Sequence, residues 1–303
     1  MLVYESFAEH VDICLVIQLS CNFLFQVIEL RHRGSPLAFS YFYDIESYSF
    51  LLYGREMKDL IDTKLYYINL DSRIDRRIQF ESQEALHTMP PVQRIPAVHG
   101  MSIDIVNDTR VGLHSRIQLI TEFRRSHYEI HSRGAVGASF SHYNTWKAFL
   151  KTDAKYALIL EDDVKLPATF SMMVRDCAKD LPENWDIWIL GWNHDTRDIL
   201  EKRQSPFRKI IHFVGAHSYI VSRKAAKLLI KNMFPIETHI EHYMSNVAFI
   251  NKFNIVRDIR LHIPQQNRTL TISDVRKADG CPTCKVDDRD EATNARIVNM
   301  VAK

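Results

Sequence analysis

Short apolar runs alternate with stretches of helical periodicity from residue 64 to about residue 275. Five runs of aliphatic and aromatic side chains have strand length and polar flanks, which predicts buried strands at residues 65–70, 155–161, 185–192, 217–221 and 253–263. Between them, apolar positions recur three or four residues apart, which predicts helices at residues 71–87, 135–151 and 222–232. Strands that alternate with helices predict an α/β fold around a mostly parallel central sheet.

Two of these helices begin with residues that commonly cap a helix. Ser222 directly precedes the periodic segment that ends near residue 232, and a serine there accepts a hydrogen bond from a free backbone N–H group. Ser72 and Asp75 have the spacing of a capping box at the start of the helix after residue 70.

The two ends of the chain do not follow the alternation. We therefore expect an N-terminal extension at residues 1–63, a main domain at residues 64–275 and a polar tail at residues 276–303. Residues 11–30 are apolar with polar interruptions, which favours a buried helix or a partner-facing segment. Residues 35–54 are rich in aromatic side chains and fit either a small hairpin or a helical subdomain.

The apolar segment near the N-terminus is a poor membrane anchor. Its uncharged part runs from Ile13 to Ile28, which is shorter than the roughly 20 residues that a membrane-spanning helix needs. No basic cluster precedes it, as would be typical of a signal peptide. We therefore predict a cytoplasmic protein that associates at most peripherally with membranes.

Charge and cysteine content narrow the function classes. The formal net charge is +2, which gives no support to nucleic-acid binding because a basic stripe would be expected for that function. The five cysteines are scattered and odd in number, which argues against a disulfide framework. Cys281 and Cys284 form a lone CxxC pair; a redox or metal role stays open, and a chance pair in a polar tail is favoured.

Three acids follow the predicted strand at residues 155–161. Strand alternation puts Glu161 and Asp163 on one side and Asp162 on the other. Ligands of open α/β sheets bind beyond the carboxyl ends of the strands, and two converging carboxylates suit Mg²⁺ or Mn²⁺. Such an ion could hold a diphosphate while a bond breaks. The alternative is an acidic turn that is simply solvated.

A second cluster of charge follows the strand at residues 65–70. Arg73, Arg76 and Arg77 lie where that strand meets the next helix. The N-terminus of a helix has free N–H groups and favours anions, so this turn could bind phosphate. Arginines on the surface of a helix are more often just solvated, and the cluster alone does not decide between the two interpretations.

Six blocks of this sequence appear in the order of a known family. They are "YYINLDSRIDRR" (66–77), "RIPAVHG" (94–100), "GAVGASFSHYNTWKAF" (134–149), "LILEDDV" (158–164), "GAHSYIVSRKAAKLL" (215–229) and "PIETHIEHYM" (235–244). The chain resembles glycosyltransferase family 25, which holds lipooligosaccharide and collagen galactosyltransferases. The resemblance implies a GT-A-like fold, a UDP-sugar donor, a divalent cation such as Mn²⁺ or Mg²⁺, and inversion at the sugar carbon.

The resemblance assigns the two charged clusters. It identifies "EDD" with the acidic metal motif, so that Glu161 and Asp163 would hold the metal and diphosphate, and Asp162 would support them or contact the ribose. Asn69, Arg73 and Arg76 would contact the nucleotide. His262 lies at the end of a late strand, and a late histidine is a metal ligand in some GT-A enzymes.

The middle blocks supply further residues for the donor pocket. Ser141 and His142 match the family's serine and histidine, although a packed histidine beside Trp146 explains His142 equally well. Gly215 and His217 fall in the segment that shapes the sugar and acceptor side, where glycine permits close backbone approach.

The block "PIETHIEHYM" carries the acids for catalysis. Inversion in one displacement needs a base that takes the proton of the attacking hydroxyl. The family has an aspartate where this chain has Glu237, and Glu241 is the second candidate for the base. His99 and Ala138 also depart from the family's usual acid and cysteine.

We therefore expect a metal-dependent inverting glycosyltransferase that moves a hexose, galactose or glucose, from a UDP-sugar to a glycan, glycoprotein or hydroxylated side chain. Residues 112–134 are expected to border the acceptor cleft. The alternatives are a catalytically inactive glycosyltransferase-like binding module, which the departures at Glu237, His99 and Ala138 would explain, and a metal-dependent phosphohydrolase.

Overall fold

The chain divides into two compact units, Met1–Lys58 and Asp59–Lys303. The computed structural model describes residues 62–121, 126, 128–130, 132–197 and 205–265, together with the backbone of the strands at residues 5–8, 11–20, 23–32 and 35–42. Residues 276–303, including Cys281 and Cys284, lie outside the described residues, as do residues 43–54 of the aromatic-rich segment.

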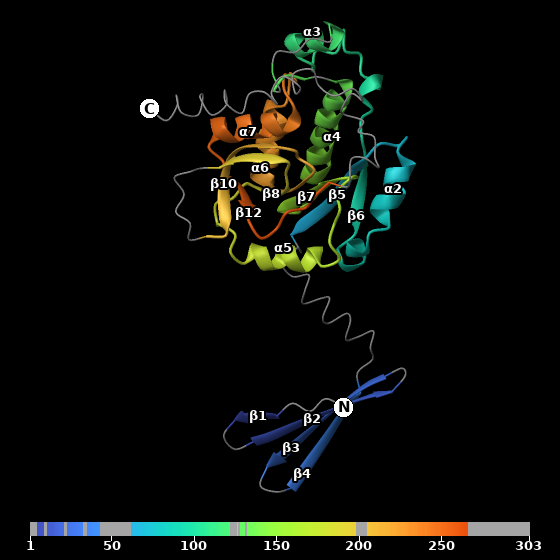
Figure 1. Cartoon of the computed structure of the whole chain (residues 1–303), viewed down its shortest axis with the longest axis vertical. Helices are drawn as coiled ribbons and strands as arrows, with labels where there is room; N and C mark the ends of the chain where they lie inside the picture. Colours follow the sequence, from blue (N-terminus) through green and yellow to red (C-terminus); the bar gives the residue numbers. More distant parts are fainter. Residues whose placement is uncertain are drawn as a thin grey trace, which may run out of the picture. The chain divides into compact units, whose positions relative to one another are not determined.

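The N-terminal unit contains a four-stranded antiparallel sheet (Figure 1). Its strands follow chain order: β1 Glu5–Ala8, β2 Val11–Ser20, β3 Phe23–His32 and β4 Ser35–Phe42. The helix expected at residues 11–30 is therefore wrong, because β2 and β3 pair as a hairpin with Ser20 opposite Phe23. The signal for a strand was present: from Val11 to Leu19 every second residue is aliphatic, which is the period of a strand.

The described helices include no segment that combines the length and the apolar character needed to cross a membrane.

The second unit is a mixed α/β structure around one eight-stranded sheet, with the strand order β6-β5-β7-β11-β8-β12-β10-β9. The strands are β5 Thr63–Asn69, β6 Val92–Pro96, β7 Tyr156–Glu161, β8 Ile187–Gly191, β9 His194–Arg197, β10 Phe207–Val214, β11 Ser218–Ser222 and β12 Ile255–Asp258. The helices are α2 Ile74–Glu81, α3 Leu113–Thr121, α4 Arg133–Leu150, α5 Phe170–Ala178, α6 Arg223–Asn232 and α7 Ile240–Asn251, with short 3₁₀ turns η2 Glu84–Thr88 and η3 Gly100–Ser102.

The sheet is mixed, so the expectation of a mostly parallel sheet is wrong. The pairs β5–β6, β5–β7 and β8–β12 are parallel, whereas the other four neighbouring pairs are antiparallel. The reason is the chain between β8 and β11. It runs through strands β9 and β10 instead of a crossover helix, and only a crossover connection forces consecutive strands to be parallel.

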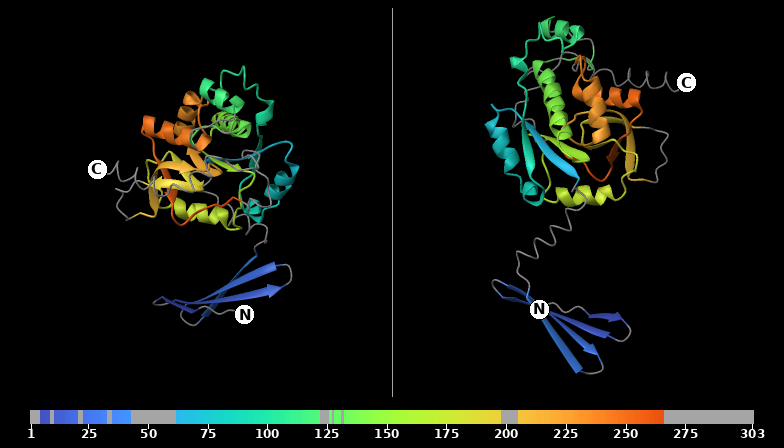
Figure 2. Two further views of the ribbon diagram at one scale, coloured as in Figure 1. Left: turned by 45° about the horizontal axis from the view of Figure 1, so that its top comes forward. Right: turned by 180° about the vertical axis from the view of Figure 1, so that it is seen from behind.

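Helices cover both faces of this sheet, as the periodic patterns predict (Figures 1 and 2). On one face α4, α6 and α7 pack through Phe140, Trp146, Leu229 and Met244, among others. On the other face α5 packs through Phe170, Val174 and Cys177. Every one of these side chains is at most 5% exposed, so both faces of the central strands are removed from water.

The ends of the helices show which capping predictions hold. Ser222 caps α6, because its side chain accepts a hydrogen bond from the Ala225 N–H group, as predicted. The capping box of Ser72 and Asp75 is wrong: Arg73 stands at the cap position of α2 without a side-chain cap bond, and Asp75 pairs with the Arg73 guanidinium at 2.8 Å. The helix ends at Glu81, well before residue 87.

Strand β12 is also shorter than the segment 253–263 that predicted it. It ends at Asp258, whose carboxylate accepts a hydrogen bond from the backbone N–H of Arg260 at 2.8 Å. This local bond turns the chain, and the apolar residues Leu261 and Ile263 beyond the turn are buried without continuing the strand.

Candidate functional site

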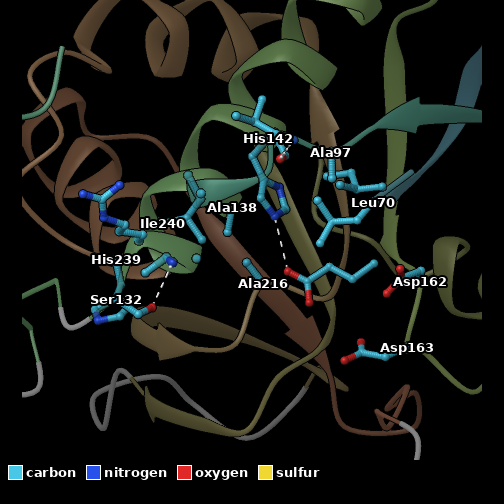
Figure 3. A pocket seen from close by; sticks show the side chains of 18 of the residues that line it. Leu70, Ala97, Ser132, Ala138, His142, Asp162, Asp163, Ala216, His239 and Ile240 are labelled. Carbon is cyan, nitrogen blue, oxygen red and sulfur yellow. Dashed lines mark hydrogen bonds and ion pairs between the residues drawn. The ribbon is translucent and has the colours of Figure 1, made fainter. Parts of the chain in front are cut away.

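A cavity of about 610 Å³ opens at the carboxyl ends of β5 and β7. Figure 3 shows Asp162 and Asp163 on one side of it, His142 in the middle, and Ser132 and His239 on the other side. Nine of the residues that the sequence predicts for the site line this cavity: Asn69, Arg76, Ser141, His142, Glu161, Asp162, Asp163, Gly215 and Glu241. Arg73, His217, Glu237 and His262 do not line it.

The acids after β7 face a guanidinium from α2. One terminal nitrogen of Arg76 lies 2.9 Å from the Asp162 carboxylate, and the other lies 2.8 Å from that of Asp163. Strand alternation therefore stops at Glu161, since all three acids line the same cavity instead of facing opposite sides. Because Arg76 is only 9% exposed, this is a largely buried charge network and not a solvated acidic turn.

Strand β5 orients the middle acid. The Asn69 side-chain amide donates to the Asp162 carboxylate at 2.7 Å and to the Arg73 carbonyl at 3.1 Å. The guanidinium of Arg94 in turn donates to the Asn69 side-chain oxygen at 3.0 Å. Asn69 is thereby fixed at both ends of its amide, which sets the position of Asp162 from a neighbouring strand.

The environment shifts the pKa values of the three acids in different directions. Burial raises the pKa of Asp162 to about 6, although Arg76 and Asn69 oppose the shift. Burial and the negative charge of Glu161 raise the pKa of Asp163. Burial also disfavours the charged form of Glu161, but His142, His217 and Arg76 outweigh it and lower its pKa. Glu161 therefore stays ionised while its two neighbours hold protons more readily than usual.

A chain of buried hydrogen bonds positions His142 against Glu161. Trp146 Nε1–H donates to the Tyr219 hydroxyl at 2.9 Å, the hydroxyl lies 2.8 Å from His142 Nδ1, and His142 Nε2 lies 3.4 Å from Glu161. Since the tryptophan can only donate, the Tyr219 proton is free to point to Nδ1. The imidazole proton then resides on Nε2 and points to the carboxylate. His142 is thus a packed side chain that also lines the cavity and meets Glu161 there.

Ser141 lines the cavity but uses its hydroxyl for structure. The hydroxyl donates to the Gly137 carbonyl at 2.7 Å and accepts from the Val98 N–H at 2.9 Å. It therefore ties the loop after β6 to helix α4. A donor molecule that contacted this hydroxyl would have to share one of those two bonds.

Gly215 and His217 lie on the segment that leads from β10 into β11. Gly215 has φ +89°, a left-handed conformation that suits glycine, and a Cβ atom there would come within 2.6 Å of the Asn193 side chain. His217 is 1% exposed and its Nε2–H donates to the Ile263 carbonyl at 2.9 Å. Gly215 thus shapes the cavity wall, whereas His217 braces the chain after β12.

The two candidate bases are four residues apart and have different surroundings. The Glu237 carboxylate accepts from the Ser115 backbone N–H at 3.3 Å and from the Ser115 hydroxyl at 3.2 Å, which places it at the N-terminus of α3. Glu241 lines the cavity from the first turn of α7. Burial raises the pKa of Glu241, and the negative charge of Glu161 adds to the shift.

The remaining two candidates make local contacts outside the cavity. Arg73 pairs with Asp75 at the start of α2. His262 Nε2–H donates to the Trp192 carbonyl at 2.9 Å, and the two rings meet edge to face at 4.4 Å. Neither the expected nucleotide contact Arg73 nor the expected metal ligand His262 lines the cavity.

Glu161 and Asp163 suit a divalent cation best among the predicted metal ligands. Both line the cavity, and their side chains keep 29% and 19% of their surface exposed. Mg²⁺ is commonly held by one or two carboxylates together with substrate phosphates. The part of the chain that the structure describes holds no group of three or more His, Cys, Asp or Glu residues arranged as a metal site. The two carboxylates alone fall short of such a group, and a diphosphate would supply the further oxygen ligands that a divalent cation needs.

The cavity also contains polar residues that the sequence pattern did not single out: Gln118, Arg133, Asn193, His239 and Gln265. Asn193 was within reach, because it follows β8 and ligands gather beyond the carboxyl ends of strands. Gln118 and Arg133 belong to the segment expected to border the acceptor cleft, but nothing in its composition distinguishes them from solvated residues.

Comparison with known proteins places the chain in a family. The model of glycosyltransferase family 25 (LPS biosynthesis protein) matches residues 62–244, more than half of the chain. Procollagen galactosyltransferase 1-A of Xenopus laevis is 23% identical over 229 residues, which are 71% of this chain and 35% of that protein. A glycosyltransferase 25 family member of Anopheles gambiae is 26% identical over 129 residues, 42% of this chain and 21% of that protein.

Procollagen galactosyltransferase 1 of Danio rerio is 22% identical over 250 residues, which are 74% of this chain and 39% of that protein. The chain therefore spans well under half of the length of these relatives. The expected family is confirmed: this chain belongs to glycosyltransferase family 25.

Proposed function

We propose that this chain is a metal-dependent, inverting hexosyltransferase with a GT-A-like nucleotide-sugar-binding domain at residues 64–275. It would move galactose or glucose from a UDP-sugar to a hydroxyl group of a glycan or a protein side chain. The observation that carries the proposal is that Glu161, Asp163 and Glu241 line a single cavity in a chain of family 25. That cavity has the size of ordinary small-molecule sites.

The acidic end of the cavity is the proposed donor site. Asn69 and Arg76 are placed there to meet the nucleotide, and Arg76 also holds Asp162 and Asp163 in position before the donor arrives. Glu161 and Asp163 would hold a bound Mn²⁺ or Mg²⁺, which would neutralise the charge on the departing UDP. The chain from Trp146 through Tyr219 and His142 fixes the orientation of Glu161.

Glu241 is the proposed general base. In an inverting transfer the acceptor hydroxyl attacks the sugar carbon as the bond to UDP breaks, and its proton passes to a carboxylate. The raised pKa of Glu241 makes this carboxylate a stronger base than an exposed glutamate. We prefer Glu241 to Glu237 because the Glu237 carboxylate is engaged by Ser115.

A panel of UDP-sugars tests the proposal. The full chain would be incubated with each donor and Mn²⁺, with and without an acceptor glycan or a peptide with a hydroxylated side chain, and free UDP would be measured. Release that depends on one donor, on the metal and on an acceptor supports the proposal. Donor binding without release would indicate an inactive binding module, and phosphate release from simple esters would indicate a hydrolase.

A further inference from the structure

The end of the cavity that lies away from Asp162 and Asp163 has its own chemistry. It is lined by Gln118 of α3, by Ser132 and Arg133 at the start of α4, and by His239 just before α7. Figure 3 shows Ser132 and His239 on this side of His142, opposite Asp162 and Asp163. We call Gln118, Ser132, Arg133 and His239 the basic end of the cavity.

Arg133 gives this end a positive charge. One guanidinium nitrogen of Arg133 donates to the Ile103 carbonyl at 3.4 Å, and the guanidinium forms no ion pair with a carboxylate among the described residues. The guanidinium therefore contrasts with that of Arg76, which is neutralised by two acids. Arg133 is also the first residue of an 18-residue helix, whose positive dipole end favours anions.

Gln118 provides an independent sign of a ligand. It is 6% exposed, its Nε2 lies 2.8 Å from His114 Nε2, and its Oε1 is buried without a partner. Buried polar atoms are nearly always hydrogen-bonded, and an unpaired one is costly.

Gln118 has an unpaired polar group in either orientation of its side-chain amide. His114 Nε2 also lies 3.1 Å from Glu129, and its proton suits that carboxylate. Turning the amide would give His114 the oxygen and leave the amide N–H₂ group unpaired instead. A hydroxyl group both donates and accepts, so it satisfies Gln118 in either orientation.

From these contacts we infer that the basic end of the cavity is the acceptor subsite and that it takes a sugar that carries an acidic group. A hydroxyl of that sugar would pair with Gln118, and its carboxylate or phosphate would pair with Arg133, which binds such groups bidentately. The inference rests on the proposed transferase function and names the class of its acceptor. It favours an anionic glycan over an acceptor with a free ammonium group.

Three matched acceptors test the inference. They are a methyl hexoside, the same hexoside with a carboxylate in place of the hydroxymethyl group, and the 6-phosphate of the unmodified hexoside. UDP release would give kcat/KM for each with the full chain and the productive donor. We expect at least one acidic sugar to exceed the neutral sugar by about tenfold, consistent with a charge-assisted pair. The ranking of carboxylate and phosphate identifies the source of the anion.

Two arginine variants separate charge recognition from folding. Arg133→Gln should remove the preference by lowering kcat/KM for the acidic sugars about tenfold while the neutral sugar changes less than about twofold. Arg116→Gln is the control, because Arg116 also bonds a carbonyl of the same loop, that of Val106 at 2.8 Å, but does not line the cavity. Its kinetics should match the wild type.

Equal use of the three sugars by the wild type would overturn the inference, and so would an equal loss for all three in Arg133→Gln. If no UDP-sugar is consumed with any acceptor, the proposed function fails, and calorimetric binding of the three sugars still decides the inference. Tighter binding of an acidic sugar that disappears in Arg133→Gln supports it. Equal binding, or no binding, contradicts it.

Discussion

Acids stand at the ends of two strands of the central sheet, and they are compensated in different ways. Asp258, the last residue of β12, is completely buried and pairs with Arg260, only two residues away, at 2.6 Å. After β7, Asp162 and Asp163 pair with Arg76, which belongs to a different element. The pair at β12 stabilises a local turn, whereas the ion pairs at β7 connect two elements, α2 and the end of β7, at the wall of the cavity.

The pKa values follow the same division. Burial disfavours the charged form of Asp258, but Arg260 outweighs it and lowers the pKa of Asp258. At β7 burial wins, so the pKa values of Asp162 and Asp163 rise. A carboxylate with a lowered pKa contributes to stability in its charged form. A carboxylate with a raised pKa is disfavoured in its charged form, and a bound cation would stabilise that form. The contrast separates Asp258 from Asp162 and Asp163, whereas the pKa of their neighbour Glu161 is lowered.

The largest effect is expected from Glu241→Gln, which tests whether chemistry occurs on the β7 side. Removal of a general base should lower kcat about a thousandfold, while the donor KM changes less than about threefold. Because a base must be ionised and the pKa of Glu241 is raised, wild-type kcat should climb with pH above the usual glutamate range. UDP-release kinetics from pH 5 to 9 measure both effects. A variant that keeps its turnover would show that another group is the base.

Asp258→Asn tests the structural side of the comparison. It leaves Arg260 without its buried partner and should lower the free energy of unfolding by about 1–3 kcal/mol, with kcat unchanged. Because the pKa of Asp258 is lowered, its contribution is complete above pH 4 and is lost as the pH falls through the folded-state value. The difference in the free energy of unfolding between the wild type and Asp258→Asn should therefore become smaller at acidic pH. Urea unfolding at pH 7 and pH 3 measures it, and a loss of activity at full stability would contradict the assignment.

Tyr219→Phe asks whether the buried chain behind Glu161 serves the site. The variant loses the hydroxyl that holds His142 Nδ1, so we expect the donor KM to rise about tenfold. Tyr243→Phe is the control, because the Tyr243 hydroxyl donates to the Leu229 carbonyl and lies outside this chain of bonds. If both variants change only stability, the chain is structural.

The smallest effect is expected from Glu237→Gln. Glu237 is exposed and meets the N-terminus of α3 through Ser115, so neutralising it should cost about 0.3–1 kcal/mol of stability and change turnover less than about threefold. Thermal unfolding and UDP-release assays provide the two values. A loss of turnover comparable to that of Glu241→Gln would move the base to Glu237.

Local sequence signals were sufficient for much of the fold. The apolar runs at β5, β7, β8 and β11 and the Ser222 cap of α6 depend on neighbours within a few residues, and each is present in the structure. The direction of a strand depends on the connection that leads to it. The antiparallel direction of β11 relative to its neighbours could therefore not be predicted from the alternation of elements. At the N-terminus the period-two pattern of β2 was present but was outweighed by its overall apolar character.

The site divides in the same way. Glu161 to Asp163 could be predicted because three acids at a strand end are a local feature. Their compensation by Arg76, from a segment 86 and 87 residues earlier in the chain, is a tertiary fact. The different positions of Glu237 and Glu241 could not be predicted either, because both suit the same motif and only the packing of α3 against Glu237 separates them.

Calorimetric titration of UDP into wild-type protein and Asp163→Asn, with and without Mn²⁺, tests the central claim that the acids after β7 form a cation-assisted donor site. We predict that wild-type binding depends on Mn²⁺ and that Asp163→Asn weakens it about a hundredfold, in line with the loss of a metal ligand. Asp258→Asn, the structural counterpart, should bind like the wild type. Equally tight UDP binding by Asp163→Asn, or binding that ignores the metal, would contradict the account.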